Sequence, residues 1–203
     1  SEKKRNPAPP FITSTLQQEA SRRLGMTPRR TMSIAQQLYE GVDIPGEGTV
    51  GLITYMRTDS LRISDEALGA AKEYIENRYG KPYHPGEPRR FKTKKAAQDA
   101  HEAIRPSDVR LEPDKIGLKG DQLKLYRLIW SRFIASQMAP AVYDALAVDV
   151  AAGGYLFKGS FSTIKFNGYT AVYEESREEE DEDKPISLPD LKEGELLKLE
   201  KLE

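Results

Sequence analysis

The sequence contains no cysteine, and it has only two histidines and one tryptophan among its 203 residues. Without cysteine the chain can form neither disulfides nor thiolate metal sites, which is typical of a protein from a reducing compartment. No apolar run approaches the roughly 20 residues that a membrane-spanning helix needs. The first ten residues, SEKKRNPAPP, also lack the apolar core of a signal peptide. These absences favour a cytoplasmic protein that does not contact membranes.

The formal net charge of −1 hides an uneven distribution of charge along the chain. Acidic residues concentrate in EESREEEDEDK, residues 174–184, whereas basic residues gather in the first half, as in KKR at 3–5 and RRFKTKK at 89–95. A phosphate backbone responds to local charge and not to the total. One such basic cluster is usually a solvated face, but several together favour a nucleic-acid partner.

The first part of the chain reads as a linker followed by two short helices. Residues 1–12 are polar and proline-rich, which predicts an incoming linker or arch segment. Ser14 and Gln17 have the spacing of a capping box, and Gly25 suits the residue that follows a helix. We therefore expect the first helix to begin at Ser14.

A second helix follows at once, with Thr27 as its N-cap, Pro28 in its first turn and Gly41 as its terminator. Two helices joined by so short a turn form an αα-hairpin similar to a helix-turn-helix. Arg29 and Arg30 stand at the start of the second helix, where we expect them to face phosphates.

Patterning in the middle of the chain predicts further helices and one strand. Ser64 is a suitable cap for a helix that Gly80 ends, and the longest helix carries Trp130 among its core-facing residues. In chain order the prediction is a glycine-rich loop over 41–48, a strand over 50–55, helices over 64–80 and 94–105, and the long helix over 121–138.

Beyond residue 140 the apolar residues alternate with period two, which indicates strands. The segments 142–150, 154–162 and 163–173 are strand-like, with turns at Gly153-Gly154 and Asn167-Gly168. The acidic segment 174–184 predicts a loop, and residues 189–203 return to strand-like alternation that stops abruptly, as in a truncated chain. The predicted fold class is therefore mostly α with a β-rich part (α+β), divided into a helical domain over 13–140 and a β-rich segment over 141–203.

One short stretch, GLITYMRTDS at residues 51–60, combines a buried strand with reactive side chains. Successive strand residues point to opposite faces, so Tyr55, Arg57 and Asp59 share one face. Such a strand either surfaces at this point or presents a tyrosine to a substrate.

This stretch resembles the active-site signature of the type IA DNA topoisomerases, specifically of their bacterial members. Three further segments resemble the same family in the same order, and the similarity runs from Pro10 to the end of the chain. They are PFITSTLQQEASRRLGM at 10–26, AQDAHEAIRPSD at 97–108 and LYRLIWSRFIASQMAPAVYD at 125–144.

The resemblance implies that a phenol attacks a DNA phosphodiester, forms a 5′-phosphotyrosine link and later religates the strand without ATP. It implies that Tyr55 is the nucleophile, that Arg57 stabilises the scissile phosphate and that His101 supports phosphate binding. A guanidinium suits that role, because it stabilises the charge that develops on the phosphate. The expected contacts to DNA, which is bound as single-stranded segments, come from Arg105, Thr58, Asp59, Ser60, Arg29 and Arg30, with Ser107 as a further candidate.

The family's enzymes also contain a Toprim domain whose acidic residues hold Mg²⁺, and many have cysteine zinc modules. This sequence resembles neither. The resemblance therefore implies a central fragment of the toroid, made of the helical nucleophile-bearing domain and part of the β arch. We expect such a fragment to be a monomer that binds DNA without turnover, binds no metal itself, and belongs to the nucleoid of a bacterial cytoplasm.

Two other functions remain open from the residues. The helix pair over 14–41 could be a non-catalytic DNA-binding module. Asp99, His101 and Glu102 could serve a metal-dependent nuclease, although on a helix consecutive side chains diverge by about 100° around the axis.

Overall fold

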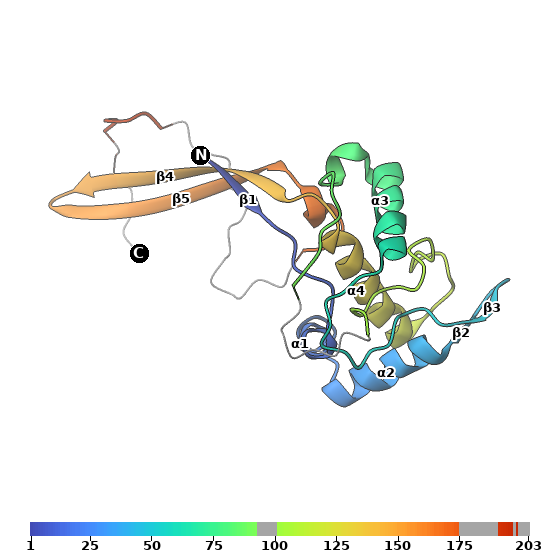
Figure 1. Ribbon diagram of the computed structural model, residues 1–203. Coiled ribbons are helices and arrows are strands. Elements are labelled where there is room, and N and C mark those ends of the chain that lie inside the picture. The colour runs from blue at the N-terminus through green and yellow to red at the C-terminus, as the bar shows by residue number, and fades with distance from the viewer. Residues whose placement is uncertain (93–100, 175–190, 197, 199–203) are drawn as a thin grey trace.

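A computed structural model describes residues 1–92, 101–174, 191–196 and 198. Figure 1 shows helices gathered at one end of the molecule and a long β-hairpin projecting from them. The combination of helices with antiparallel strands confirms the predicted α+β class. Among the described residues, no helix has the length and apolar character that crossing a bilayer requires.

The two predicted N-terminal helices are present as α1, Thr13–Leu24, and α2, Pro28–Glu40. The predicted start at Ser14 is wrong, because α1 begins at Thr13 and the Thr15 hydroxyl, not that of Ser14, accepts the Ile12 N–H at 3.0 Å. Gly25 ends α1 in the left-handed region at φ 62°, as predicted. The cap of α2 is also confirmed, since the Thr27 hydroxyl accepts the Arg30 N–H at 3.3 Å.

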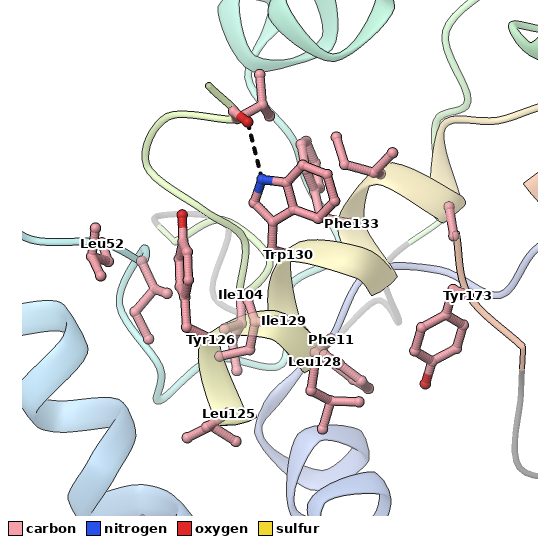
Figure 2. Close-up of a cluster of buried hydrophobic side chains, with 14 of the residues drawn as sticks. Phe11, Leu52, Ile104, Leu125, Tyr126, Leu128, Ile129, Trp130, Phe133 and Tyr173 are labelled. Atoms are coloured by element: carbon pink, nitrogen blue, oxygen red, sulfur yellow. Dashed lines mark hydrogen bonds between the residues drawn. The ribbon is translucent and has the colours of Figure 1, made fainter. Parts of the chain in front are cut away.

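The core surrounds α4, Gly120–Ser136, which lies among the other helices (Figure 1). Its buried side chains meet Phe11, Leu52 and Ile104 from distant parts of the chain (Figure 2). Trp130 is a core residue, as predicted, and its indole N–H donates to the Val109 carbonyl at 3.0 Å. The remaining helical elements are α3, Asp65–Tyr79, and the 3-10 turns η1, Lys81–Tyr83, and η2, Gly168–Ala171.

The strands form two separate sheets. The larger is antiparallel in the order β1-β4-β5, with β1 at Glu2–Arg5, β4 at Ala141–Ala152 and β5 at Tyr155–Phe166. Residues 1–12 are thus not simply a linker, because β1 pairs with the start of β4. The smaller sheet pairs β2, Val42–Ile44, with β3, Gly48–Val50, where only a loop was predicted.

The predictions for the β-rich segment are partly confirmed. Gly153 and Gly154 make the turn between β4 and β5 with φ of 53° and 86°. The chain also turns at Asn167-Gly168, where the Asn167 carbonyl accepts the Thr170 N–H at 3.0 Å. The strand predicted over 163–173 is wrong beyond Phe166, because β5 ends there and the chain enters η2. At Gly168 a Cβ would lie 2.4 Å from the Pro140 carbonyl oxygen, so close packing determines the path there. The described residues 191–196 contain no strand, while the rest of that stretch and the acidic segment after Glu174 lie outside the described residues.

A buried polar cluster joins the end of the β-rich segment to the helices. The Tyr173 hydroxyl donates to the Glu19 carboxylate at 2.9 Å, and Arg23 binds the same carboxylate at 2.6 Å. Burial raises the pKa of Tyr173 to about 12. Arg132 of α4 lies over the Tyr173 ring at 5.2 Å and donates to the Pro9 carbonyl at 2.7 Å.

Candidate active site

The stretch 51–60 is held in place by three different neighbours in turn. The Leu52 N–H donates to the Leu38 carbonyl at the end of α2, at 2.7 Å. The Thr54 N–H then donates to the Arg105 carbonyl at 3.0 Å, and the Thr58 N–H to the Thr13 hydroxyl at 2.9 Å. Because no single strand accompanies the stretch, the predicted strand over 50–55 is wrong: β3 ends at Val50, and only an isolated bridge remains at Ile53.

The alternation predicted for this stretch is nevertheless present. Met56 and Thr58 are buried, whereas Arg57 and Asp59 are exposed and Tyr55 is half-buried. Buried and exposed side chains alternate here even though the backbone bends at Met56 and Arg57. Tyr55, Arg57 and Asp59 therefore face outward together.

The Tyr55 ring contacts two other rings. The His101 ring is 5.1 Å away between centroids at an interplanar angle of 36°, and the Tyr39 ring is 5.4 Å away at 69°, an edge-on arrangement. Within the part of the chain that the structure describes, the Tyr55 hydroxyl has no hydrogen-bond partner. Contacts of the Tyr55 ring thus hold the side chain, and its hydroxyl oxygen is available to a substrate.

His101 reaches Tyr55 because the residues after it are not helical. The helix expected over 94–105 is wrong in its described part, since residues 101–105 are not helical and Ile104 forms an isolated bridge with Phe11. The Ile104 N–H donates to the Phe11 carbonyl at 2.8 Å, and the Ala103 carbonyl accepts the Thr54 hydroxyl at 2.7 Å. These long-range bonds replace the bonds of a helix and place His101 beside the tyrosine.

An open depression of about 460 Å³ lies next to this group of residues. Arg57, Asp59 and His101 line it on one side, and the first turn of α1, with Ser14 and Gln17, lines it on the other. The start of a helix carries partial positive charge, and Arg57 adds a full positive charge. The depression therefore combines cationic and hydroxyl groups that suit a phosphate, with one carboxylate beside them.

The two predicted hydroxyl contacts lie beneath this surface. Thr58 is 8% exposed and Ser60 is fully buried. The Thr58 hydroxyl accepts the Ser60 N–H at 3.0 Å, and the Ser60 hydroxyl accepts the Arg62 N–H at 3.2 Å. In this structure both side chains brace the turn that follows Arg57, and their DNA contacts stay a prediction.

Arg105 also makes internal bonds. Its guanidinium donates to the Glu102 carboxylate at 2.7 Å and to the Pro106 carbonyl at 2.9 Å, and its side chain is 13% exposed. The Ser107 hydroxyl donates to the Gly51 carbonyl at 2.7 Å. Arg105 thus stabilises the 102–107 segment internally, and Ser107 joins that segment to the stretch 51–60.

Arg29 and Arg30 lie apart from Tyr55, in a second open depression between the starts of α2 and α4. Both are exposed, and Arg30 pairs with Asp121 at 2.7 Å. Lys119 lines the same depression. The predicted basic start of α2 is thus at the surface, but one of its two charges is neutralised.

Within residues 1–92, 101–174, 191–196 and 198, no three side chains of His, Asp or Glu gather closely enough to hold a metal ion. Glu102 is bound to Arg105, and His101 packs on Tyr55. Asp99, the third residue of the nuclease hypothesis, lies outside the described residues.

The sequence interpretation missed Tyr39, Ser14 and Gln17 as neighbours of the site. Tyr39 lies in the last turn of α2, where it is 41% exposed. An exposed tyrosine at a helix end carries no local signal that links it to a residue 16 positions later. Only the position of α2 against residues 51–52 brings the two rings together.

Comparison with known proteins identifies the family of this chain. The family model described as DNA topoisomerase matches residues 1–203. The chain belongs to the type IA DNA topoisomerase family. A solved structure, that of full-length topoisomerase I from Thermotoga maritima, is similar to it with a TM-score of 0.76 and 45% sequence identity. That similarity covers 87% of this chain and 29% of the Thermotoga protein, so the chain spans less than a third of the length of that topoisomerase.

Proposed function

We propose that this chain supplies the nucleophile-bearing part of an enzyme that changes DNA topology by breaking and rejoining one strand. The observation that carries the proposal is the arrangement of Tyr55, whose ring is held by His101 and Tyr39 and whose hydroxyl is available beside the depression that Arg57 lines. A module that only bound DNA would not need a phenol presented in this way. The resulting activity is an ATP-independent isomerase activity that relaxes negative supercoils.

In the proposed reaction the Tyr55 oxygen attacks the phosphorus of a phosphodiester. A bond forms between the Tyr55 oxygen and the phosphorus, which stays attached to the 5′ oxygen, and the bond from phosphorus to the 3′ oxygen breaks. The phenol loses one proton, and the freed 3′ oxygen takes up one proton to become a hydroxyl. Arg57 stabilises the charge that develops on the phosphoryl oxygens, and His101 supports the same phosphate. Rejoining reverses these steps, because the phosphotyrosine link keeps the energy of the original bond.

The DNA in this proposal is a single strand that crosses the outward face of Tyr55, Arg57 and Asp59. Arg29 and Arg30 contact its backbone further along α2, where both are exposed. Thr58, Ser60 and Arg105 assist by fixing the positions of the residues that touch DNA. We also propose that the chain acts as a monomer in the bacterial nucleoid.

The magnesium that this family uses is proposed to bind outside this chain. The internal pairing of Glu102 with Arg105 supports this proposal. The chain alone is then expected to bind DNA without relaxing it, because the phosphate lacks the metal that helps to place it.

The proposal is tested by incubating the natural full-length protein with a labelled single-stranded oligonucleotide and magnesium, followed by a denaturing gel. The expected result is a covalent protein–DNA adduct that Tyr55→Phe abolishes. Tyr155→Phe is the matched control, because Tyr155 is 74% exposed at the tip of the β4–β5 hairpin. An adduct formed by Tyr55→Phe, or cleavage that leaves only free ends, would contradict the proposal.

A further inference from the structure

Tyr39 is the one aromatic side chain of α2, and its ring meets the Tyr55 ring edge-on at 5.4 Å. Edge-on contacts are a favoured geometry for two aromatic rings, because the positive edge of one ring faces the negative face of the other. The Tyr55 ring also contacts the His101 ring, at 5.1 Å between centroids. The proposed nucleophile's ring is therefore in contact with two rings from distant parts of the chain.

The backbone fixes the distance between Tyr39 and Tyr55. The Leu52 N–H donates to the Leu38 carbonyl, and Gly51 passes so close to Tyr39 that a Cβ on this glycine would lie 2.8 Å from the Tyr39 carbonyl oxygen. The end of α2 and residues 51–52 are thus in direct backbone contact at two successive positions. Because the backbones are locked together here, the Tyr39 ring can limit how the Tyr55 ring moves.

Among the described residues the Tyr55 hydroxyl has no hydrogen-bond partner that would fix its direction. The direction of the side chain therefore depends on packing, which comes from the hydrophobic core and from the two ring contacts. A displacement of about 1 Å in a reacting group can cost on the order of a hundredfold in rate. Because 41% of Tyr39 is exposed, its burial adds little to the stability of the fold, so stability alone does not explain a tyrosine at this position.

We infer that Tyr39 is a positioning residue that holds the Tyr55 ring in the direction required for attack. Its own hydroxyl plays no part, and it does not bind the DNA. This role presupposes the proposed function, because it has meaning only if Tyr55 is the nucleophile.

The test measures single-turnover cleavage of a labelled oligonucleotide by the full-length protein, together with the dissociation constant for the same oligonucleotide. Tyr39→Ala should slow cleavage about tenfold, which is the upper range expected for one edge-on aromatic contact, and should leave the dissociation constant unchanged. Tyr39→Phe keeps the ring and should restore the rate to within about twofold, since the edge-on contact remains. Tyr155→Ala is the control for loss of an exposed tyrosine.

Tyr39→Leu covers the case in which the alanine variant does not fold, because it retains bulk at the helix end. It should be slow like the alanine variant. Three outcomes would overturn the inference and leave the proposed function intact. The first is an unchanged cleavage rate in both Tyr39→Ala and Tyr39→Leu, and the second is a Tyr39→Phe variant as slow as Tyr39→Ala. The third is weaker DNA binding without slower cleavage. Absence of an adduct with the unmodified protein would instead overturn the proposed function, and the inference with it.

Discussion

Gly51 lies so close to Tyr39 that a side chain at this position would collide with the Tyr39 carbonyl oxygen at 2.8 Å. The oxygen belongs to the backbone of α2 and cannot move aside as the tip of a flexible side chain could. This contact, together with the bond from Leu52 to Leu38, determines how the tyrosine stretch meets the helix.

Gly51→Ala should destabilise the chain and slow adduct formation, because the tyrosine stretch must shift away from α2. Overpacking of this kind costs about 1–3 kcal/mol of unfolding free energy. Gly69→Ala is the matched control, because Gly69 lies in α3 with open space around its missing Cβ. That variant should gain about 0.5–1 kcal/mol, since glycine is unfavourable inside a helix. Chemical denaturation of both variants measures the two effects, and equal stabilities would contradict the close contact.

Arg57→Ala should reduce the rate of cleavage without affecting the fold. Removing one group that stabilises developing charge costs about 10²–10³ in rate. Because Arg57 is exposed, the free energy of unfolding should change by less than about 0.5 kcal/mol. The comparison is Lys158→Ala, which removes an exposed positive charge on β5. If both variants slowed cleavage equally, Arg57 would act only through the net charge of the protein.

Arg105 and Arg29 should respond differently to replacement by alanine. Without Arg105, the largely buried Glu102 carboxylate loses its partner, and the chain should lose about 1–3 kcal/mol of stability. Changing Glu102 to glutamine in the same chain should restore part of that loss. An Arg105→Ala variant that is stable but binds DNA more weakly would show that Arg105 contacts DNA directly.

Arg29→Ala should leave stability unchanged, weaken DNA binding and lower its salt dependence, as the loss of a phosphate contact does.

Stability should decrease on mild acidification because of His84. This side chain is 6% exposed and its Nδ1 accepts the Gly86 N–H at 3.2 Å. Burial, aided by the positive charge of Lys72, lowers the pKa of His84 below its ordinary value. In the unfolded chain His84 takes up a proton near pH 6.5, whereas in the folded chain it stays neutral to lower pH. The folded state therefore has its full stability, as far as His84 is concerned, above about pH 6.5, and it loses stability as the pH falls toward the folded-state pKa of His84.

Melting temperatures of the unmodified chain and of His84→Gln between pH 7.5 and pH 5.5 check this expectation. The unmodified chain should melt at progressively lower temperature as the pH falls, and the variant should show a flatter profile. An equal slope in both proteins would show that other groups cause the pH dependence.

Local signals in the sequence were enough to predict most of the helices. A cap such as Thr27 and a terminator such as Gly25 act through bonds within a few residues, so their effect can be read without knowing the fold. The outward direction of Tyr55, Arg57 and Asp59 was predictable for the same reason, because the alternation of side chains is a local property of the backbone.

The predictions failed where partners distant in sequence replace local ones. β1 exists because it pairs with residues about 140 positions later, and residues 101–106 are not helical because they bond to Phe11 and Thr54 and not to one another. The prediction that Tyr55 is the nucleophile came from the resemblance of residues 51–60 to a family signature, because the residues alone did not distinguish a surfacing strand from a presented tyrosine. The contacts of the Tyr55 ring with His101 and Tyr39 were decided by the tertiary structure alone, because the free energy that fixes those contacts comes from packing α2 and the 101–106 segment onto a common core.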